Sequence, residues 1–444
     1  MNTAADSTLT TRLLIIAGIA LGMLIPLFMV QDVVDERLQT HNGVLADIAG
    51  VWGERQLLQG PVLIVPFTEK QVVDEQSTDK NGMAHTLSTT HFVRRSAVFL
   101  PDDLAIHIGL AEQYRSRGIY DSLVYTMDAD VQGSFALTPI NALSERVQTV
   151  HWDAAYLAVG LTDTRAINKV TPLQWEGKEY RFDPGTAMGK AMPTGFHAAP
   201  AGLSADKSRY RFQFAVNANG SSALRFTAFG TSTKVDMHSA WPHPSFQGKV
   251  LPATRAVRND GFTAHWEIPN LARNYPQQWI LEEADYDLSE FQAGVDLFEP
   301  VFLYSQITRS VKYGILFVAL TFLTFLIFEL TVKAKLHYVQ YGLIGLALSL
   351  FFLVLLSLSE HLAFSLAYFA AATLTVLMIA AYTYGMLGSV RRAGIILGLL
   401  AGLYTLLFFL LRLEDYALLM GTALLLAVLG ILMYLTQHLE MDDG

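Results

Sequence analysis

The sequence predicts a membrane protein with six transmembrane α-helices in a 1 + 5 arrangement and a large, mainly β, sandwich-like domain with some α-helix inserted between helices 1 and 2. Two observations carry this prediction. Long apolar stretches lie only before residue 31 and after residue 310, and the residues between them contain short runs in which polar and apolar side chains alternate. About 20 apolar residues in a helix cross the apolar layer of a membrane, whereas alternation is typical of half-buried strands.

The first apolar stretch follows a short segment, 1–12, and runs from Leu13 to Val30 without a charged side chain. A cleaved export signal is the alternative to a membrane anchor. Cleavage requires small residues in an A-x-A pattern, which the residues after the apolar core lack. We therefore expect an uncleaved membrane helix that continues outward through Val33 to Trp52.

Five more apolar stretches follow within residues 311–435. The expected spans are 313–328, 341–358, 363–387, 393–411 and 417–435, followed by a tail of residues 436–444. Buried helices of a soluble enzyme are the alternative, but these rarely exceed about 14 wholly apolar residues and usually keep a polar face. Their length therefore favours membrane helices.

Basic residues in the connectors predict the orientation, because Lys and Arg are retained on the cytoplasmic side of a membrane. If the N-terminus is inside, the inner connectors contain Lys333, Lys335, Arg391 and Arg392, and the two outer connectors contain only Arg412. Both termini are then cytoplasmic, and residues 31–310 lie outside, which in a bacterial inner membrane is the periplasm.

Charge and cysteine content constrain the domain of residues 31–310. The chain has a formal net charge of -9, and almost all of it falls in this domain. Nucleic acid requires a basic surface, so we expect no nucleic-acid partner. The chain has no cysteine, and a domain of this size is large enough to be stable through its core alone.

Several segments of this domain predict antiparallel strands. Residues 61–67, 94–100 and 262–269 are short runs rich in β-branched and aromatic residues. The clearest predicted hairpin joins 210–216 to 224–229 through Asn219-Gly220, a dipeptide that tolerates positive φ. We expect two packed sandwich-like halves.

Two further segments are expected to lack regular structure. The polar tract 70–90 predicts a solvated hairpin loop, and the segment 184–208, rich in Gly, Ala and Pro, predicts a long connector or a flap near the membrane.

The sequence contains no catalytic constellation. Gly185 to Ala191 resembles a phosphate loop, but its glycines are one residue too close together and Ala191 replaces the Ser or Thr that would bind magnesium. H-E-x-x-H and G-x-S-x-G motifs are absent. His238 and His243 are close in sequence and are a candidate zinc pair, although an ordinary surface loop is the favoured interpretation. We expect no cofactor and no metal.

The membrane spans have no ionisable side chain near their centres, which argues against ion-coupled transport. Glu329, at the inner end of the second span, is expected to pair with Lys333 one turn away. The outer turns contain further candidates for coupling the bundle to the domain, namely Glu360 and His361 in one turn, and Arg412, Glu414 and Asp415 in the other.

Glycines spaced four residues apart predict where helices pack, because small residues let helices approach closely in lipid. Gly18 and Gly22 form such a stripe on the first span, and Gly394, Gly398 and Gly402 form one on the fifth. We expect the first helix to pack against the five-helix bundle along the second stripe.

Several ordered segments resemble the CreD family of bacterial inner-membrane proteins, over nearly the whole chain. The resemblance implies a multi-pass inner-membrane protein that is linked to cell-envelope integrity and stress response. It also implies that a two-component regulatory system controls production of the protein in relatives, and that no catalytic residues are established. The matching segments are Trp52-Gly53, Gly60-Pro61-Val62-Leu63, residues 309–314, Phe328-Glu329-Leu330, residues 337–342, Leu358-Ser359-Glu360-His361 and residues 413–418.

Three classes of function remain open. The first is a non-enzymatic envelope protein whose periplasmic domain binds an envelope protein, glycan or lipid while the bundle contacts membrane lipids; the sequence leaves its oligomeric state open. The second is a transporter or lipid-handling protein, and the third is a periplasmic hydrolase or metalloprotein centred on His238 and His243. Hydroxyl groups available to line a cavity of the second class belong to Tyr368, Thr373, Thr375, Tyr382 and Tyr384.

Overall fold

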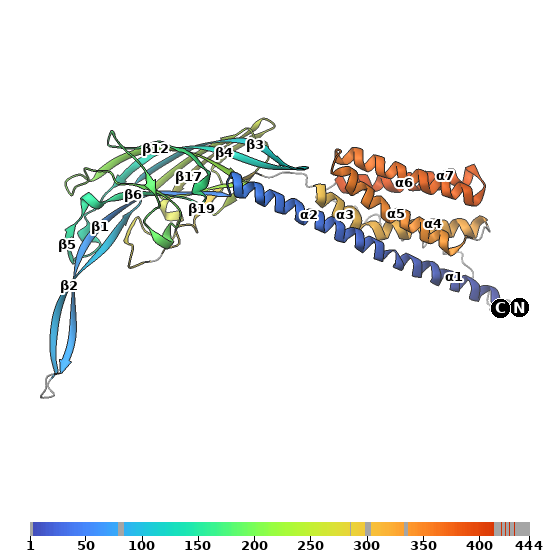
Figure 1. Ribbon diagram of the computed structural model, residues 1–444, viewed down its shortest axis with the longest axis horizontal. Helices are drawn as coiled ribbons and strands as arrows, with labels where there is room; N and C mark the ends of the chain where they lie inside the picture. The colour runs from blue at the N-terminus through green and yellow to red at the C-terminus, as the bar shows by residue number, and fades with distance from the viewer. Residues whose placement is uncertain are drawn as a thin grey trace. The chain divides into compact units, whose positions relative to one another are not determined.

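The computed structural model describes residues 3–78, 84–284, 286–297, 303–332 and 336–412, together with Leu419, Thr422, Leu426 and Gly430. The chain divides into two compact units (Figure 1). The helical unit comprises residues 1–43 and 301–444, and the β unit comprises residues 44–300. The predicted order of an N-terminal helix, a mainly β unit and a group of apolar helices is confirmed.

Seven α-helices are described, most of them in the helical unit. Among the described residues, four helical segments are long and apolar enough to cross a membrane, and α3 and α4, bent by 41° at their junction, make a fifth if they form one span. The predicted span 417–435 lies outside the described residues except for four helical positions. The helices are α1 (Thr3–Gly22), α2 (Leu24–Trp52), α3 (Leu303–Lys312), α4 (Gly314–Val332), α5 (Tyr338–Ser359), α6 (Phe364–Leu387) and α7 (Val390–Arg412).

The boundaries of the β unit differ from the predicted 31–310. The helix continues to Trp52, as expected, so the first 13 residues of that range belong to the helical unit. At the other end, α3 also belongs to the helical unit. This helix is amphipathic: Ile307 and Val311 are buried, while Arg309 and Lys312 lie in its last turn. The charged residues of α3 made it resemble a polar flank of the domain in the sequence.

Buried aromatic rings form the centre of the helical unit. The Phe351 ring lies 4.6 Å from the Tyr404 ring and 5.6 Å from the Tyr368 ring, measured between centroids. The Tyr368 hydroxyl donates a hydrogen bond to the Tyr404 carbonyl at 2.7 Å. This bond satisfies a polar group that would otherwise be costly to bury, and it joins α6 to α7.

The glycine stripes do not mark the contacts that the sequence predicted. No heavy atom of the described structure lies within 4 Å of a Cβ built on Gly18, Gly22, Gly394, Gly398 or Gly402. The first helix does pack in the bundle, but α1 contacts α4 and α5.

Two other glycines provide the close approach. A Cβ on Gly345 would lie 2.6 Å from the Met23 sulfur, and a Cβ on Gly314 would lie 2.8 Å from a Leu27 methyl carbon. Each is a single glycine facing a large side chain, and neither belongs to a four-residue repeat. Regular spacing of glycines in the sequence therefore does not predict these two contacts.

The β unit consists of two sheets that share one hydrophobic core. Sheet A contains ten described strands and sheet B contains nine. Side chains from both sheets belong to the same buried cluster, so the β unit is one sandwich with one core, whereas two sandwich-like halves were expected. Short 3-10 helices, such as Ile140–Ala142, join some of the strands.

Sheet A follows the order β10-β11-β6-β1-β13-β19-β15, with β2 and β5 also pairing with β1, and β18 with β2. Its strands are β1 (Gln56–Thr78), β2 (Ala84–Phe99), β5 (Val147–Val150), β6 (Tyr156–Leu161), β10 (Asp183–Pro184), β11 (Gly195–Ala198), β13 (Ala223–Thr227), β15 (Pro244–Gly248), β18 (Gln278–Ile280) and β19 (Gln292–Leu297).

Sheet B follows the order β16-β17-β14-β3-β4-β12-β8-β9, with β7 also pairing with β12. Its strands are β3 (Asp103–Arg117), β4 (Tyr120–Ala136), β7 (Ile167–Val170), β8 (Leu173–Trp175), β9 (Lys178–Tyr180), β12 (Arg209–Ser221), β14 (Ser232–Ser239), β16 (Thr254–Arg258) and β17 (Gly261–Pro269).

The predicted hairpin at Asn219-Gly220 is wrong. Both residues lie inside β12, where Gly220 is opposite Tyr125 of β4. The chain turns only at Ser222, which has a φ of 60°, and β13 then joins the other sheet. A glycine is required at position 220 for a different reason: a Cβ there would lie 2.4 Å from the buried Tyr125 ring.

The two polar segments are also more ordered than expected. Within 70–90, β1 and β2 pair continuously up to Thr78 and Ala84, so this hairpin is a two-stranded ribbon that extends from sheet A (Figure 1). Within 184–208, β11 pairs with β6, and Met188 and Met192 are buried. This segment therefore contributes to the core and to sheet A.

A buried carboxylate anchors the start of β1. The Asp163 side chain accepts hydrogen bonds from the Arg165 guanidinium at 2.9 Å and from the Glu54 amide at 3.3 Å. Burial raises the pKa of Asp163, but these hydrogen bonds outweigh it and hold the pKa below the usual range of an aspartate.

We predict that Asp163→Asn destabilises the β unit by about 1.5 kcal/mol at pH 7, because hydrogen bonds to a charged acceptor are lost. A lowered folded-state pKa stabilises the protein above the unfolded pKa, about 4, and this stabilisation is lost as pH falls through the folded-state value. Thermal unfolding of both proteins should therefore differ at pH 7 and converge toward pH 3. An equal difference at both values would contradict the assignment.

Candidate functional site

The outward face of sheet B carries a row of alternating imidazoles and carboxylates. His265, Asp236, His107 and Asp130 lie directly opposite one another on β17, β14, β3 and β4. His265 Nδ1 lies 2.7 Å from one Asp236 oxygen, and His107 Nδ1 lies 3.3 Å from the other. Asp236 thus connects two histidines that are far apart in sequence.

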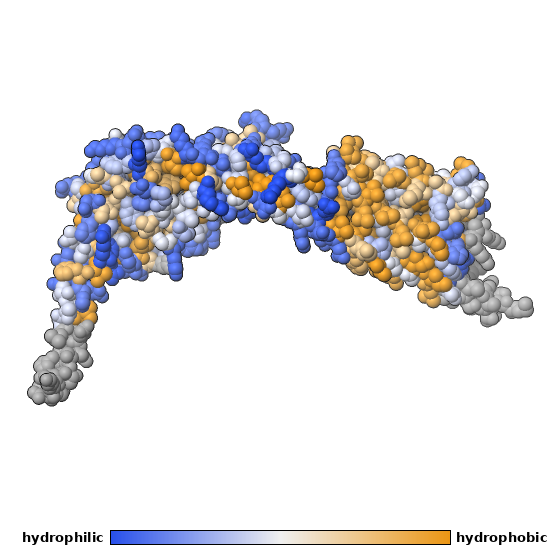
Figure 2. All heavy atoms as spheres, in the orientation of Figure 1, coloured by the Kyte–Doolittle hydropathy of each residue, from blue (hydrophilic) through white to orange (hydrophobic). Residues whose placement is uncertain are grey.

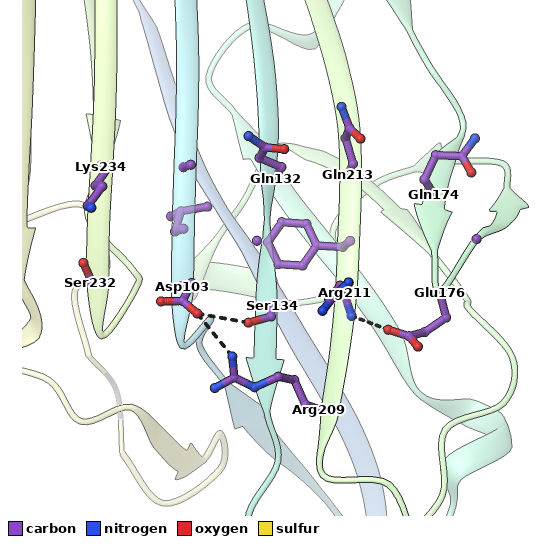
Figure 3. Close-up of a pocket in the computed structure, with 15 residues that line it drawn as sticks. Asp103, Gln132, Ser134, Gln174, Glu176, Arg209, Arg211, Gln213, Ser232 and Lys234 are labelled. Carbon is purple, nitrogen blue, oxygen red and sulfur yellow. Dashed lines mark hydrogen bonds and ion pairs between the residues drawn. The ribbon is translucent and has the colours of Figure 1, made fainter.

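A second row on the same face carries carboxamides. Gln132 lies opposite Gln213, which lies opposite Gln174. Figure 3 shows these three side chains side by side on β4, β12 and β8. The Gln213 amide also donates to Asp130 at 3.3 Å, which joins the second row to the first.

Small residues leave hollows within these rows and beside them: Ala105 lies opposite Gln132 of the second row, Ala215 lies opposite Asp130 of the first, and Gly109 lies two residues beyond His107 on β3. Ala105, Gly109 and Ala111 occupy outward positions of β3, and Ala215 occupies one of β12. Three cavities open on this face, with volumes of about 990, 560 and 490 Å³. The first surrounds Ala105, the second surrounds Gly109, and the third lies over β14, β16 and β17.

Most charged groups around the largest cavity already have partners (Figure 3). Asp103 is 3.4 Å from Arg209, whose guanidinium also lies 2.6 Å from Asp102. Glu176 accepts hydrogen bonds from the Lys207 ammonium and, at 2.6 Å, from the Arg211 amide. These two bonds, the first above all, lower the pKa of Glu176. The cavity therefore offers paired charges and polar groups without a strong net charge.

Large apolar side chains are directed to the other side of the sheet. Along β14, for example, Val235 and Met237 are buried, whereas Lys234, Asp236 and His238 are exposed. Figure 2 shows the β unit mostly blue and white, whereas orange predominates over the helical unit. We call this surface, the outward side chains of β17, β14, β3, β4, β12 and β8, the polar face.

Comparison with known proteins connects this fold to a family. The model of the family described as "Inner membrane protein CreD" matches residues 8–442. The chain belongs to the CreD family. The "Inner membrane protein CreD" of Escherichia coli (strain K12) is 30% identical over 424 residues, which cover 95% of this chain and 91% of that protein. Membership of this family and the apolar helices together show that the chain is a multi-pass membrane protein.

Solved structures add no information on function. The chain is similar to an M1 zinc metallopeptidase from Deinococcus radiodurans over 38% of both chains, with 9% identity and a TM-score of 0.18. A similarity at that level carries no argument about fold or activity.

The candidate zinc pair is not assembled into a metal site. His238 points outward from β14, where its ring would lie 3.2 Å from a Cβ on Gly109, whereas His243 precedes β15 of the other sheet and stacks edge-on with Trp241. Among the described residues, no group of three or more His, Cys, Asp or Glu side chains is placed to bind a metal ion.

Glu329 pairs with Arg12, a partner that the sequence did not predict. Its carboxylate lies 2.5 Å from the Arg12 guanidinium and accepts a hydrogen bond from the Tyr341 hydroxyl at 3.1 Å. Arg12 also donates to the Leu336 carbonyl at 3.0 Å. The predicted partner, Lys333, lies outside the described residues. The ion pair thus joins α1 to α4, and the tyrosine adds α5.

The other coupling candidates have different outcomes. The Glu360 carboxylate, largely buried, lies 3.8 Å from the Arg37 guanidinium of α2, within the helical unit. His361 is exposed. Arg412 is the last residue of α7, and Glu414 and Asp415 lie outside the described residues.

The five hydroxyl-bearing residues do not share a cavity. Tyr368 and Thr373 line a groove of about 250 Å³ between α6 and α7. Thr375 is buried away from this groove, and Tyr382 and Tyr384 are exposed. The residues that line the groove are apolar or carry a hydroxyl group, and none of them is Asp, Glu, Lys, Arg or His, the residue types that mark ion pathways in membranes.

Proposed function

We propose that this protein is a non-enzymatic inner-membrane protein that contributes to envelope integrity by binding an envelope component on the polar face. In this proposal the helical unit anchors the chain, and the β unit lies in the periplasm. Support for the orientation comes from the basic connectors, which favour a cytoplasmic location of both termini.

The observation that carries the proposal is the succession of three cavities on one face of one sheet. Solvation alone does not explain why Ala105, Gly109 and Ala111 occupy three outward positions of β3, while β14 and β4 on either side carry long polar side chains. Hollows with convergent polar groups are the usual form of a binding site. No described cluster combines a nucleophile, a base and an orienting group, which favours binding over catalysis.

A tryptophan at Ala105 tests this proposal. Ala105 points outward from β3 into the largest cavity, so Ala105→Trp fills that cavity without entering the core. We expect normal amounts of membrane-inserted protein and loss of envelope function, measured as sensitivity to detergent in cells that lack the wild-type protein.

Ala142→Trp is the matched control, because Ala142 is exposed in the short 3-10 helix that follows β4, lies outside the polar face and lines none of the three cavities. This variant should behave like the wild type. If cells that produce Ala105→Trp kept wild-type detergent resistance, the polar face would not be the binding site.

A further inference from the structure

We infer that the ligand of the polar face is a sugar chain, that is, a polymer with many hydroxyl groups and little net charge. This inference rests on the proposed function and specifies the class of its ligand. Its basis is the hydrogen-bonding chemistry of the polar face and the length over which its cavities extend.

The first step concerns donors and acceptors. A carboxamide offers both a donor and an acceptor, a carboxylate only accepts, and an imidazole offers one of each when neutral. Gln132, Gln213 and Gln174 therefore stand beside Asp130 and the histidine row as a mixed set. A sugar hydroxyl both donates and accepts, so it can bond at every position of such a surface.

The second step excludes other ligand classes. Phosphate polymers only accept hydrogen bonds and require an excess of positive charge. The cations on this face are offset by carboxylates, as Arg209 is by Asp102 and Asp103, so that excess is missing. Lipid acyl chains require exposed apolar surface, and the carbon-only side chains in the middle of this face are alanines. Polycations would compete with Arg209 and Lys207 for carboxylates that are already paired.

The third step concerns length. Neighbouring strands of a sheet lie about 4.8 Å apart, so a row across β17, β14, β3, β4, β12 and β8 extends for about 24 Å. The first and second cavities follow one another along β3, β4 and β12, from Asp103 to Ala111 of β3, which is about 27 Å at 3.4 Å per residue. The second and third cavities lie side by side across the strands and share His238. This surface therefore fits a chain of several sugar rings better than a single small solute.

The test is binding of the detergent-purified full-length protein to an array of neutral and amino-sugar hexasaccharides, followed by titration calorimetry on the best binder. We expect measurable binding that the double variant Gln132→Ala/Gln213→Ala weakens about tenfold, since two hydrogen bonds are lost. Ala105→Trp should abolish binding, and Ala142→Trp should leave it unchanged. Thermal unfolding of each variant establishes that it is folded.

The outcomes separate this inference from the proposed function. If no hexasaccharide binds, or if the double variant binds as the wild type does, the sugar chain is excluded. Loss of detergent resistance in Ala105→Trp cells would then leave the proposed function in place with a ligand of another class, such as a folded protein. Binding that all three variants retain would place the sugar elsewhere on the molecule and would also overturn the inference.

Discussion

Glu329→Leu should remove most of the folded protein from the membrane. This substitution leaves the Arg12 guanidinium without its carboxylate at 2.5 Å, and it leaves the Tyr341 hydroxyl without its acceptor. Breaking one side of a buried ion pair costs about 3 kcal/mol or more, because the remaining charge stays desolvated. Membrane abundance and thermal unfolding in detergent measure the effect.

The matched control is the double variant Arg12→Leu/Glu329→Leu, which removes both charges together. Replacing both members of a buried pair by apolar residues is often neutral, so this variant should recover much of the lost stability. If Glu329→Leu alone is as stable as the wild type, the pair does not join α1 to α4. If the double variant is worse than the single one, the bond from Arg12 to the Leu336 carbonyl contributes more than the ion pair.

Gly220→Ala should be the second large effect, and it should destabilise the β unit. The added Cβ would lie 2.4 Å from both Cζ and the hydroxyl oxygen of Tyr125. This tyrosine is fully buried, and its hydroxyl donates to the Ala223 carbonyl at 2.7 Å, so the ring cannot move away without losing that bond. Overpacking of this kind costs about 3 kcal/mol. Chemical denaturation of the purified protein measures the loss.

Gly50→Ala controls for the general effect of replacing a glycine. No heavy atom lies within 4 Å of a Cβ built on Gly50, which is in the part of α2 that belongs to the β unit. Alanine is the better helix former, so this substitution should leave stability unchanged or raise it slightly. Unchanged stability of Gly220→Ala would show that β12 and β4 are not paired at Tyr125.

Apolar length was sufficient to predict most of the helices. The predicted span 341–358 falls within α5, and 363–387 matches α6 except for Ala363, which caps the helix, because nearly every side chain in these spans is apolar. Packing between helices was not predictable in the same way. Gly345 faces Met23 across a long separation in sequence, and nothing near Gly345 distinguishes it from other glycines.

The polar face could be predicted only in part. Alternation along Tyr210 to Val216 indicated correctly that Arg211 and Gln213 lie on one side of a strand. The row of histidines and carboxylates was not predictable, because it requires β14 to lie parallel to β3. Asn219-Gly220 was misread because a local turn signal cannot reveal that a buried ring on another strand excludes any side chain.

Binding of an envelope component requires the polar face to lie outside the cytoplasm, and the absence of cysteine from the chain makes that directly measurable. Gln132→Cys introduces one thiol on the polar face, and Ser389→Cys introduces one in the connector between α6 and α7, which is predicted to lie inside because it is next to Arg391 and Arg392. Cells with a permeabilised outer membrane and an intact inner membrane are treated with a maleimide that cannot cross the inner membrane. We predict labelling at position 132 before lysis and at position 389 only after lysis. Labelling at position 132 only after lysis would contradict this prediction.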